Sequence, residues 1–178
     1  KTQNSRGYYD FWIVKLDSLG NILWDKTIGG SQGENKCKII EARGGGFFLA
    51  GRSASGISGD KTVPTSKNDF WILRLDSVGN ILWQAGEGTN KEDIFEDFFQ
   101  DNWGNIILGG YRCTVPKNCE FFVSKLDSLG NLIWRNDYGG LDDDFLTNII
   151  LTSDGKHLSA GNSYSGISGD KIQDSKGG

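Results

Sequence analysis

The sequence is most informative at first for what it lacks. It has no methionine, two prolines and one histidine among its 178 residues. So little proline argues against an extended, proline-rich linker. The net charge of −4 leaves no basic excess for phosphate binding, so we expect no nucleic-acid partner. No apolar stretch approaches the roughly 20 residues that a membrane-spanning helix needs, so we expect no transmembrane segment.

What is present indicates a folded protein with many tight turns. Hydrophobic residues make up 37% of the chain and aromatic residues 12%, which excludes a disordered tail. The length is sufficient for a domain with a substantial core. The 26 glycines fit many short turns. Because the chain does not start with methionine, we expect a processed protein or a fragment of a longer one.

Two sequence blocks recur in a single register. The block Asp-Phe-Trp-Ile-Val-Lys-Leu-Asp-Ser-Leu-Gly-Asn-Ile-Leu-Trp at 10–24 returns, slightly altered, at 69–83 and 120–134. The closing tryptophans of these copies are 59 and 51 residues apart. A second block, at 47–60, returns at 157–170, an offset of 110 that equals the two periods together. Two blocks that obey the same spacing establish an internal repeat.

Each repeat unit predicts four short strands joined by glycine-containing turns. The expected strands of the two complete units are 37–43, 47–53, 70–76 and 81–87, then 94–100, 105–112, 121–127 and 132–138. The chain begins with the last two strands of a unit, at 11–16 and 22–28. It ends with the first two, at 145–152 and 158–163. No ten-residue stretch carries a helical apolar stripe, so the chain is predicted to be all-β.

The fold class that fits is all-β, with β-propeller blades built as four-stranded antiparallel meanders. In the strand at 70–76, Phe70 and Ile72 point to one face and Trp71, Leu73 and Leu75 to the other, so both faces of the sheet should be covered. A β-solenoid usually has shorter coils, and immunoglobulin-like repeats are nearer to about 100 residues.

The expected organisation is one propeller segment, 1–178, made of a half blade at 8–29, blades at 36–88 and 93–139, and a half blade at 144–165. Propellers have about 4 to 8 blades, and three repeat-equivalents do not easily close a ring. We therefore expect a partial propeller. Either blades outside this chain or another subunit would close the ring, and the sequence favours a fragment.

The three cysteines divide into a pair and a single residue. Cys113 and Cys119 flank a short loop at the ends of two predicted antiparallel strands, where a disulfide is geometrically reasonable. Such a bond would place the protein in an oxidising compartment. A metal site is less favoured, because no second cysteine or histidine pair completes it. Cys37 lies in a strand pattern and is expected to be a small buried residue.

The repeated block at 10–24, Ile-Gly-Gly-Ser at 28–31 and the two Ser-Gly-Ile-Ser-Gly-Asp segments resemble the repeats of bacterial secreted β-propeller proteins. Many of these proteins carry a sorting domain for type IX secretion. The resemblance covers nearly the whole chain. It implies export and an extracellular or cell-surface location. The family motif is structural and transfers no catalytic residue.

The strand order predicts where recognition would occur. The short turns share one rim of the blades, and the long, variable loops share the other, which is where binding usually resides. The candidate binding residues on this rim are Glu92, Asp93, Asp142, Asp143 and Asp144. Trp103, in the short turn at 102–104 of the other rim, is a further candidate because it is the tryptophan that we expect to be exposed. Oxygen-rich loops can bind Ca²⁺, but these lack the closely spaced ladder of a dedicated calcium loop, so no cofactor is expected. The Ser-Gly-Ile-Ser-Gly-Asp loops are interpreted as ordered turns.

Signals for catalysis are weak. His157 is the only histidine, occupies a strand position where another copy has Phe47, and has no nucleophile at a motif-like spacing. Trp24, Trp83 and Trp134 recur at one blade position, which indicates packing. The leading hypothesis is a non-enzymatic interaction or scaffold module that binds a protein or glycan at the cell surface. The alternatives are a polysaccharide-acting hydrolase that uses paired carboxylates such as Asp143 and Asp144, and a purely structural spacer.

Overall fold

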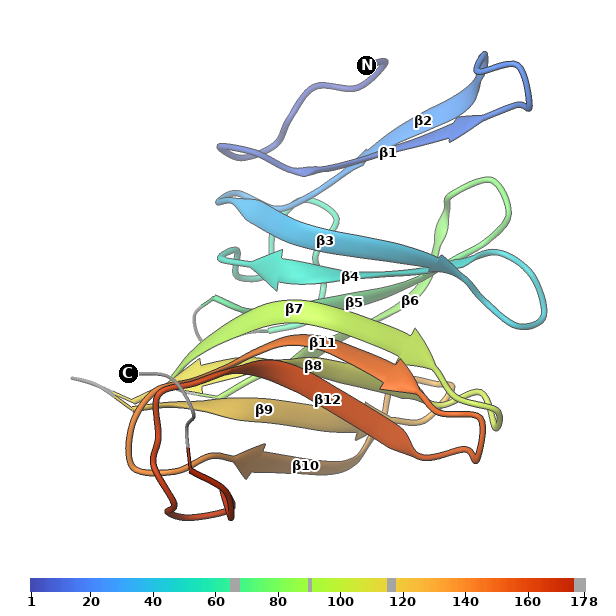
Figure 1. Ribbon diagram of the computed structural model, residues 1–178. Coiled ribbons are helices and arrows are strands. Elements are labelled where there is room, and N and C mark those ends of the chain that lie inside the picture. The colour runs from blue at the N-terminus through green and yellow to red at the C-terminus, as the bar shows by residue number, and fades with distance from the viewer. Residues whose placement is uncertain (65–67, 90, 115–117, 175–178) are drawn as a thin grey trace. The chain divides into compact units, whose positions relative to one another are not determined.

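The computed structural model describes residues 1–64, 68–89, 91–114 and 118–174 (Figure 1). These residues form twelve strands and no helix, so the chain is all-β. The strands are β1 (Phe11–Leu16), β2 (Ile22–Ile28), β3 (Glu34–Glu41), β4 (Phe47–Ser53), β5 (Asp69–Leu75), β6 (Ile81–Glu87), β7 (Glu92–Gln100), β8 (Ile106–Cys113), β9 (Cys119–Leu126), β10 (Leu132–Tyr138), β11 (Asp144–Leu151) and β12 (His157–Ser163). No helix of the described residues is long and apolar enough to cross a membrane.

The chain forms two compact units, 1–88 and 89–178. In the first, β1 and β2 form a two-stranded sheet, and β3, β4, β5 and β6 pair in that order in a four-stranded sheet. In the second, β7 to β10 form a four-stranded sheet, again in chain order, and β11 pairs with β12. All neighbouring strands of these sheets are antiparallel. The four-stranded meanders confirm the prediction of a partial, β-propeller-like fold.

The turn between the third and fourth strands has one design in all three copies. In the first copy, the Asp17 carboxylate accepts the backbone N–H of Leu19 at 2.8 Å and of Asn21 at 2.9 Å, and the Asn21 side-chain amide at 2.9 Å. Gly20 supplies the positive φ of 86° that closes the turn. Hydrogen bonds from Asn21, its side chain first, lower the pKa of Asp17. The turns at 76–80 and 127–131 repeat this bonding.

The repeated tryptophans pack, as the sequence predicts. In the first unit, the Trp24 and Phe47 rings lie edge to face with centroids 6.2 Å apart. The core of this unit joins the two sheets, with Phe11 of β1 stacked on Trp71 of β5 at 5.7 Å. In the second unit, Trp134 packs against a core formed by Ile107, Val123, Leu146 and Ile149. Aromatic side chains that pack in this way contribute a large apolar area to small cores.

The prediction that Cys37 is buried is wrong: its thiol is exposed and unpaired. The register of β3 against β4 shifts between Asn35 and Lys38, and Lys36 adopts a φ of 49°. A bulge of this kind breaks the alternation of side chains along an edge strand and turns the extra residue outward. The other two first strands also shift register at the corresponding place, β7 against β8 and β11 against β12.

The predicted disulfide is confirmed. Cys113 ends β8, Cys119 begins β9, and the two sulfurs are bonded across a Cα–Cα distance of 4.0 Å. The two cysteines are also direct cross-strand partners in the β8–β9 ladder. The bond therefore closes the short loop between the second and third strands of this blade.

Thiol counting checks the cysteine assignment. We expect denatured, unreduced protein to contain one reactive thiol, from Cys37, and three after reduction. Replacing both Cys113 and Cys119 by serine should lower the free energy of unfolding by about 2 kcal/mol, because a short loop is released in the unfolded chain. Denaturant titration of this variant beside a Cys37→Ser control measures the loss. Three thiols before reduction would contradict the bond.

Candidate functional site

Each unit has its short turns at one end of the strands and its long loops at the other. In the first unit the long-loop end carries the link at 29–33 and the loop after β4; in the second it carries the link at 139–143 and the loop after β12. We call this end of each unit the loop rim. It holds five of the six candidate binding residues, and the contacts below show which of them are accessible.

In the first unit, a buried carboxylate ties the link to the loop. Glu34 opens β3 and is 3% exposed. It accepts the Gly30 backbone N–H at 3.0 Å, the Ser53 hydroxyl at 2.8 Å and the Ser55 hydroxyl at 2.6 Å. Burial of a carboxylate is tolerated because several donors replace its hydration.

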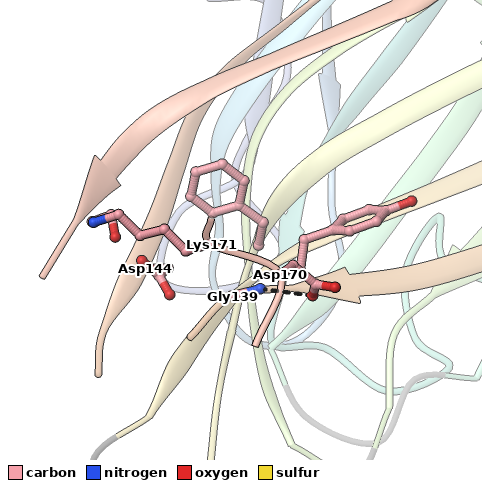
Figure 2. A pocket seen from close by; sticks show the side chains of 7 residues that line it. Gly139, Asp144, Asp170 and Lys171 are labelled. Atoms are coloured by element: carbon pink, nitrogen blue, oxygen red, sulfur yellow. Dashed lines mark hydrogen bonds between the residues drawn. The ribbon is translucent and has the colours of Figure 1, made fainter. Parts of the chain in front are cut away.

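The same ties recur in the second unit. Asp144, also buried, accepts the Gly140 backbone N–H at 2.7 Å and the Ser165 hydroxyl at 3.0 Å. Figure 2 shows a second tie, in which the Asp170 carboxylate accepts the Gly139 backbone N–H at 3.3 Å. Asp60 makes the corresponding bond to Gly29 in the first unit, at 3.1 Å. The interpretation of the Ser-Gly-Ile-Ser-Gly-Asp loops as ordered turns is confirmed.

Asp93 occupies this position in blade β7–β10 and is completely buried. Its carboxylate accepts the Thr89 backbone N–H at 2.6 Å and pairs with the Arg112 guanidinium at 2.7 Å. Arg112 also pairs with Asp137 at 2.8 Å. The structure therefore places two candidate binding residues, Asp93 and Asp144, in buried positions where they hold loops.

The other candidates lie in different places. Glu92 and Asp142 are exposed at the loop rim of the second unit. Asp143 is half-buried and accepts the backbone N–H of Cys119 at 2.9 Å. Trp103 is 71% exposed and lies in the turn between β7 and β8, at the opposite end of the strands, both as expected. The six residues therefore do not form one site.

Each complete blade also has a cation over the aromatic ring of its third strand. In the first unit, Lys61 Nζ lies 5.5 Å from the Trp71 ring centroid and donates to Ser53 Oγ and the Ser55 carbonyl, both at 2.8 Å. Burial lowers the pKa of Lys61 to about 8, although Glu34 and Asp69 oppose the shift. In the second unit, the Arg112 guanidinium lies 4.0 Å from the Phe122 ring centroid.

A pocket of about 240 Å³ opens in the second unit (Figure 2). Its lining residues are Phe121, Tyr138, Gly139, Asp144, Ser163, Asp170 and Lys171. Both of its carboxylates are acceptors of the backbone ties described above. Because Glu34 and Asp60 make the same bonds in the first unit, these two carboxylates are explained by loop geometry. Among the described residues, no group of three or more histidine, cysteine, aspartate or glutamate side chains could hold a metal ion.

His157 has a packing environment. Its ring lies 5.6 Å from the Phe99 ring and 6.1 Å from the Trp134 ring, and partial burial lowers its pKa. His157 is therefore a packed strand residue, as its alignment with Phe47 in the repeat predicts.

The loop rim of the second unit exposes apolar side chains. Leu141 is 79% exposed, Tyr164 72% and Ile167 67%. Leu141 and Ile167 lie on neighbouring loops, because the Leu141 backbone N–H donates to Ser168 Oγ at 3.0 Å. The corresponding residues of the first unit are Ser31, Ala54 and Ile57. The two rims therefore share their backbone ties but differ in the surface that they present.

Comparisons with known proteins add little to this geometry. No family model matches the chain. A segment of 49 residues is 43% identical to a tRNA(Ile)-lysidine synthase of Bacillus licheniformis, covering 28% of this chain and 10% of that protein. The crystal structure of a protein of unknown function from Bacteroides caccae is similar with a TM-score of 0.48 and 16% identity, over 82% of this chain and 44% of that one. The chain thus spans less than half of either protein.

The buried lysine predicts a pH dependence of stability. Between the folded pKa of about 8 and the ordinary value of 10.5, the unfolded chain binds a proton that the folded chain releases, so stability rises with pH across this window. Relative to a Lys61→Met variant, the wild type should gain about 1–3 kcal/mol on going from pH 8 to 10.5, at roughly 1.4 kcal/mol per pKa unit. Denaturant titrations of both proteins at pH 7, 8 and 10.5 measure the gain. A constant difference at all three pH values would contradict the assignment.

Proposed function

We propose that this chain is a non-enzymatic interaction module of an extracellular bacterial β-propeller protein, and that it binds a partner through the loop rim of its second unit. The proposal is supported by a rigid scaffold that carries loops of different composition. Backbone ties from buried carboxylates hold those loops, so the loop backbone is ordered before a partner arrives. Ordered loops lose less entropy on binding.

The observation that carries the proposal is the exposed group Leu141, Tyr164 and Ile167 beside the exposed carboxylate of Asp142. Aliphatic and tyrosine side chains that protrude together at a rim with polar neighbours are typical of protein recognition surfaces. Two of these three side chains, Leu141 and Ile167, are aliphatic, and this favours a protein partner over a glycan, whose sugar rings stack on aromatic faces. The largest exposed ring of the second unit, Trp103, lies at the opposite end of the strands.

The disulfide supports the proposed location. A bond between Cys113 and Cys119 persists in oxidising compartments and is rare in reducing ones. The net charge of −4 suits an exposed, soluble surface module and disfavours association with nucleic acid. Together with the resemblance of the repeats to secreted bacterial propellers, these features support surface display.

A matched pair of variants tests the rim. The protein is immobilised and presented with cell-surface proteins and, separately, with purified surface polysaccharides. A Leu141→Ser, Tyr164→Ser, Ile167→Ser variant should bind the protein fraction at least tenfold more weakly, because the apolar contact area is removed. A Trp103→Ser, Leu129→Ser control removes exposed apolar side chains from the opposite end and should bind like the wild type. Thermal melts establish that both variants are folded.

Four results would contradict the proposal. Release of reducing ends from a polysaccharide would indicate a hydrolase. Saturable binding of a polysaccharide without cleavage would replace the protein partner by a glycan. Equal binding of the protein fraction by the rim variant and the control would mean that the partner contacts another surface. No binding by the wild type would indicate a structural spacer.

A further inference from the structure

Three aromatic rings lie in a row at the loop rim of the second unit. The ring of Tyr111, on β8, meets that of Phe145, on β11, with centroids 4.9 Å apart and an interplanar angle of 83°. Phe145 in turn meets Tyr164, which directly follows β12, at 6.2 Å and 84°. Tyr111 and Phe145 are half-buried, whereas Tyr164 is 72% exposed. Edge-to-face packing therefore fixes this row at its inner end and leaves the Tyr164 ring open to solvent.

The exposure of Tyr164 belongs to its position in the repeat. Its counterpart in the complete blade β3–β6 is Ala54, which is also exposed although all four strands of that blade are present. The same holds for Ile167, which is 67% exposed, and its counterpart Ile57, which is 65% exposed. These loop positions therefore face solvent in a complete blade as they do in the half blade β11–β12.

Two carboxylates lie beside the row of rings. The backbone carbonyl of Asp143 accepts the Tyr164 N–H at 2.9 Å, and its side-chain Oδ1 accepts the Cys119 N–H at 2.9 Å. Asp142 is exposed, and its backbone is tied by two hydrogen bonds of 3.0 Å to Ser165, the residue after Tyr164. Among the described residues, neither carboxylate forms an ion pair. Two negative charges without a cation thus lie next to an exposed ring.

The first unit has neither these rings nor these charges. At an offset of 110 residues, the two rings of the half blade and the two carboxylates are replaced by Asn35, Ala54, Gln32 and Gly33. Both units nevertheless make the same backbone ties between link and loop. The fold of the loops therefore does not require the aromatic and acidic side chains, which leaves them available for recognition.

The same unit shows which cation suits a ring flanked by two carboxylates. The Arg112 guanidinium lies 4.0 Å from the Phe122 ring centroid and pairs with Asp93 at 2.7 Å and with Asp137 at 2.8 Å. Lys61, which also covers a ring, donates instead to a serine hydroxyl and a backbone carbonyl. A planar guanidinium stacks on a ring while its edge bonds to carboxylates, which an ammonium group cannot do in the same geometry.

We propose that the loop rim of the second unit binds an arginine side chain of its protein partner, with the guanidinium over the Tyr164 ring and paired with Asp142 and Asp143. This inference rests on the proposed function and names the chemistry that the partner presents. The charges are complementary, because the cation meets two carboxylates and the negative face of the ring. Leu141 and Ile167, on the neighbouring loops, provide apolar contacts for residues that flank the arginine.

The chemistry is tested with three blocked peptides, Gly-Leu-X-Leu-Gly, in which X is arginine, citrulline or lysine. Each is titrated into the isotope-labelled wild-type chain and followed by NMR. We expect the arginine peptide to shift the amide signals of Phe145 and Tyr164 saturably, while those of their first-unit counterparts, Asn35 and Ala54, stay unchanged. The citrulline peptide should bind about tenfold more weakly, because the cation–π contact and the ion pairs are both lost. The lysine peptide should bind more weakly than the arginine peptide.

Matched variants assign the binding groups. Tyr164→Ser should bind the arginine peptide about tenfold more weakly, whereas Tyr164→Phe, which keeps the ring, should bind like the wild type. The Asp142→Asn, Asp143→Asn variant should lose both affinity and the salt dependence of binding, although its amide oxygen still accepts the Cys119 N–H. Asp154→Asn removes an exposed carboxylate from the opposite end of the strands and should bind like the wild type. Thermal melts establish that the variants are folded.

The inference is overturned if the arginine peptide gives no saturable shift, or if the citrulline or lysine peptide binds as tightly. It is also overturned if Tyr164→Ser and the double asparagine variant bind like the wild type. The peptide and the cell-surface proteins are separate probes, so the two proposals fail separately. Loss of peptide binding with retained protein binding overturns only the arginine contact. Peptide binding without any bound cell-surface protein supports the arginine contact and contradicts the proposed function.

Discussion

The architecture depends on one buried carboxylate at the start of each first strand. Glu34, Asp93 and Asp144 recur at the repeat spacing of 59 and 51 residues, and each accepts a backbone N–H from the link that leads into its own strand. An isolated buried charge would cost several kcal/mol, so the link must fold around the carboxylate and supply donors. This requirement fixes the path of the link. The path of the link in turn fixes where the long loop after the second strand can attach.

The three copies satisfy this requirement in two ways. In the first unit, the hydroxyls of Ser53 and Ser55 donate to the carboxylate of Glu34, and Lys61 of the long loop covers the Trp71 ring. In the half blade β11–β12, the hydroxyl of Ser165 donates to Asp144. In blade β7–β10 the loop is shorter by eight residues, as the difference between the two periods shows. There, Arg112 at the position of Ser53 both pairs with Asp93 and covers Phe122. The Cys113–Cys119 bond closes the shortened loop directly beside this arginine. In this blade, one arginine therefore takes the two roles that Ser53 and Lys61 have in the first unit: it contacts the buried carboxylate and covers the ring.

The strands could be predicted because their sequence pattern occurs in each repeat. Single residues were predicted wrongly where they were not compared with the residues at the same position of the other repeats. Asp93 and Asp144 looked like rim carboxylates, yet their recurrence with Glu34 marks them as structural. Cys37 looked like a buried strand residue, yet the other copies have Glu96 and Thr147 at that position, and a bulge turns it outward. Trp103 was correctly expected to be exposed in a short turn, which the alternation of the meander puts at the end opposite to the acidic loops. Arg112 and Lys61 give no local signal, because their function comes from rings more than nine residues away in the sequence.

The same register separates residues that build the blade from residues that are available for recognition. Some positions carry the same residue in several copies, and contacts inside a blade or at its edge explain them. Examples are Gly51, Gly110 and Gly161, and the pair Lys61 and Lys171. Some positions differ between the copies and lie exposed, such as Leu141 against Ser31 and Tyr164 against Ala54. A rigid meander with invariant ties tolerates such change, because a side chain that points to solvent contributes little to stability. A partner-specific surface can therefore arise through changes of the loop-rim residues of one unit, without loss of the fold.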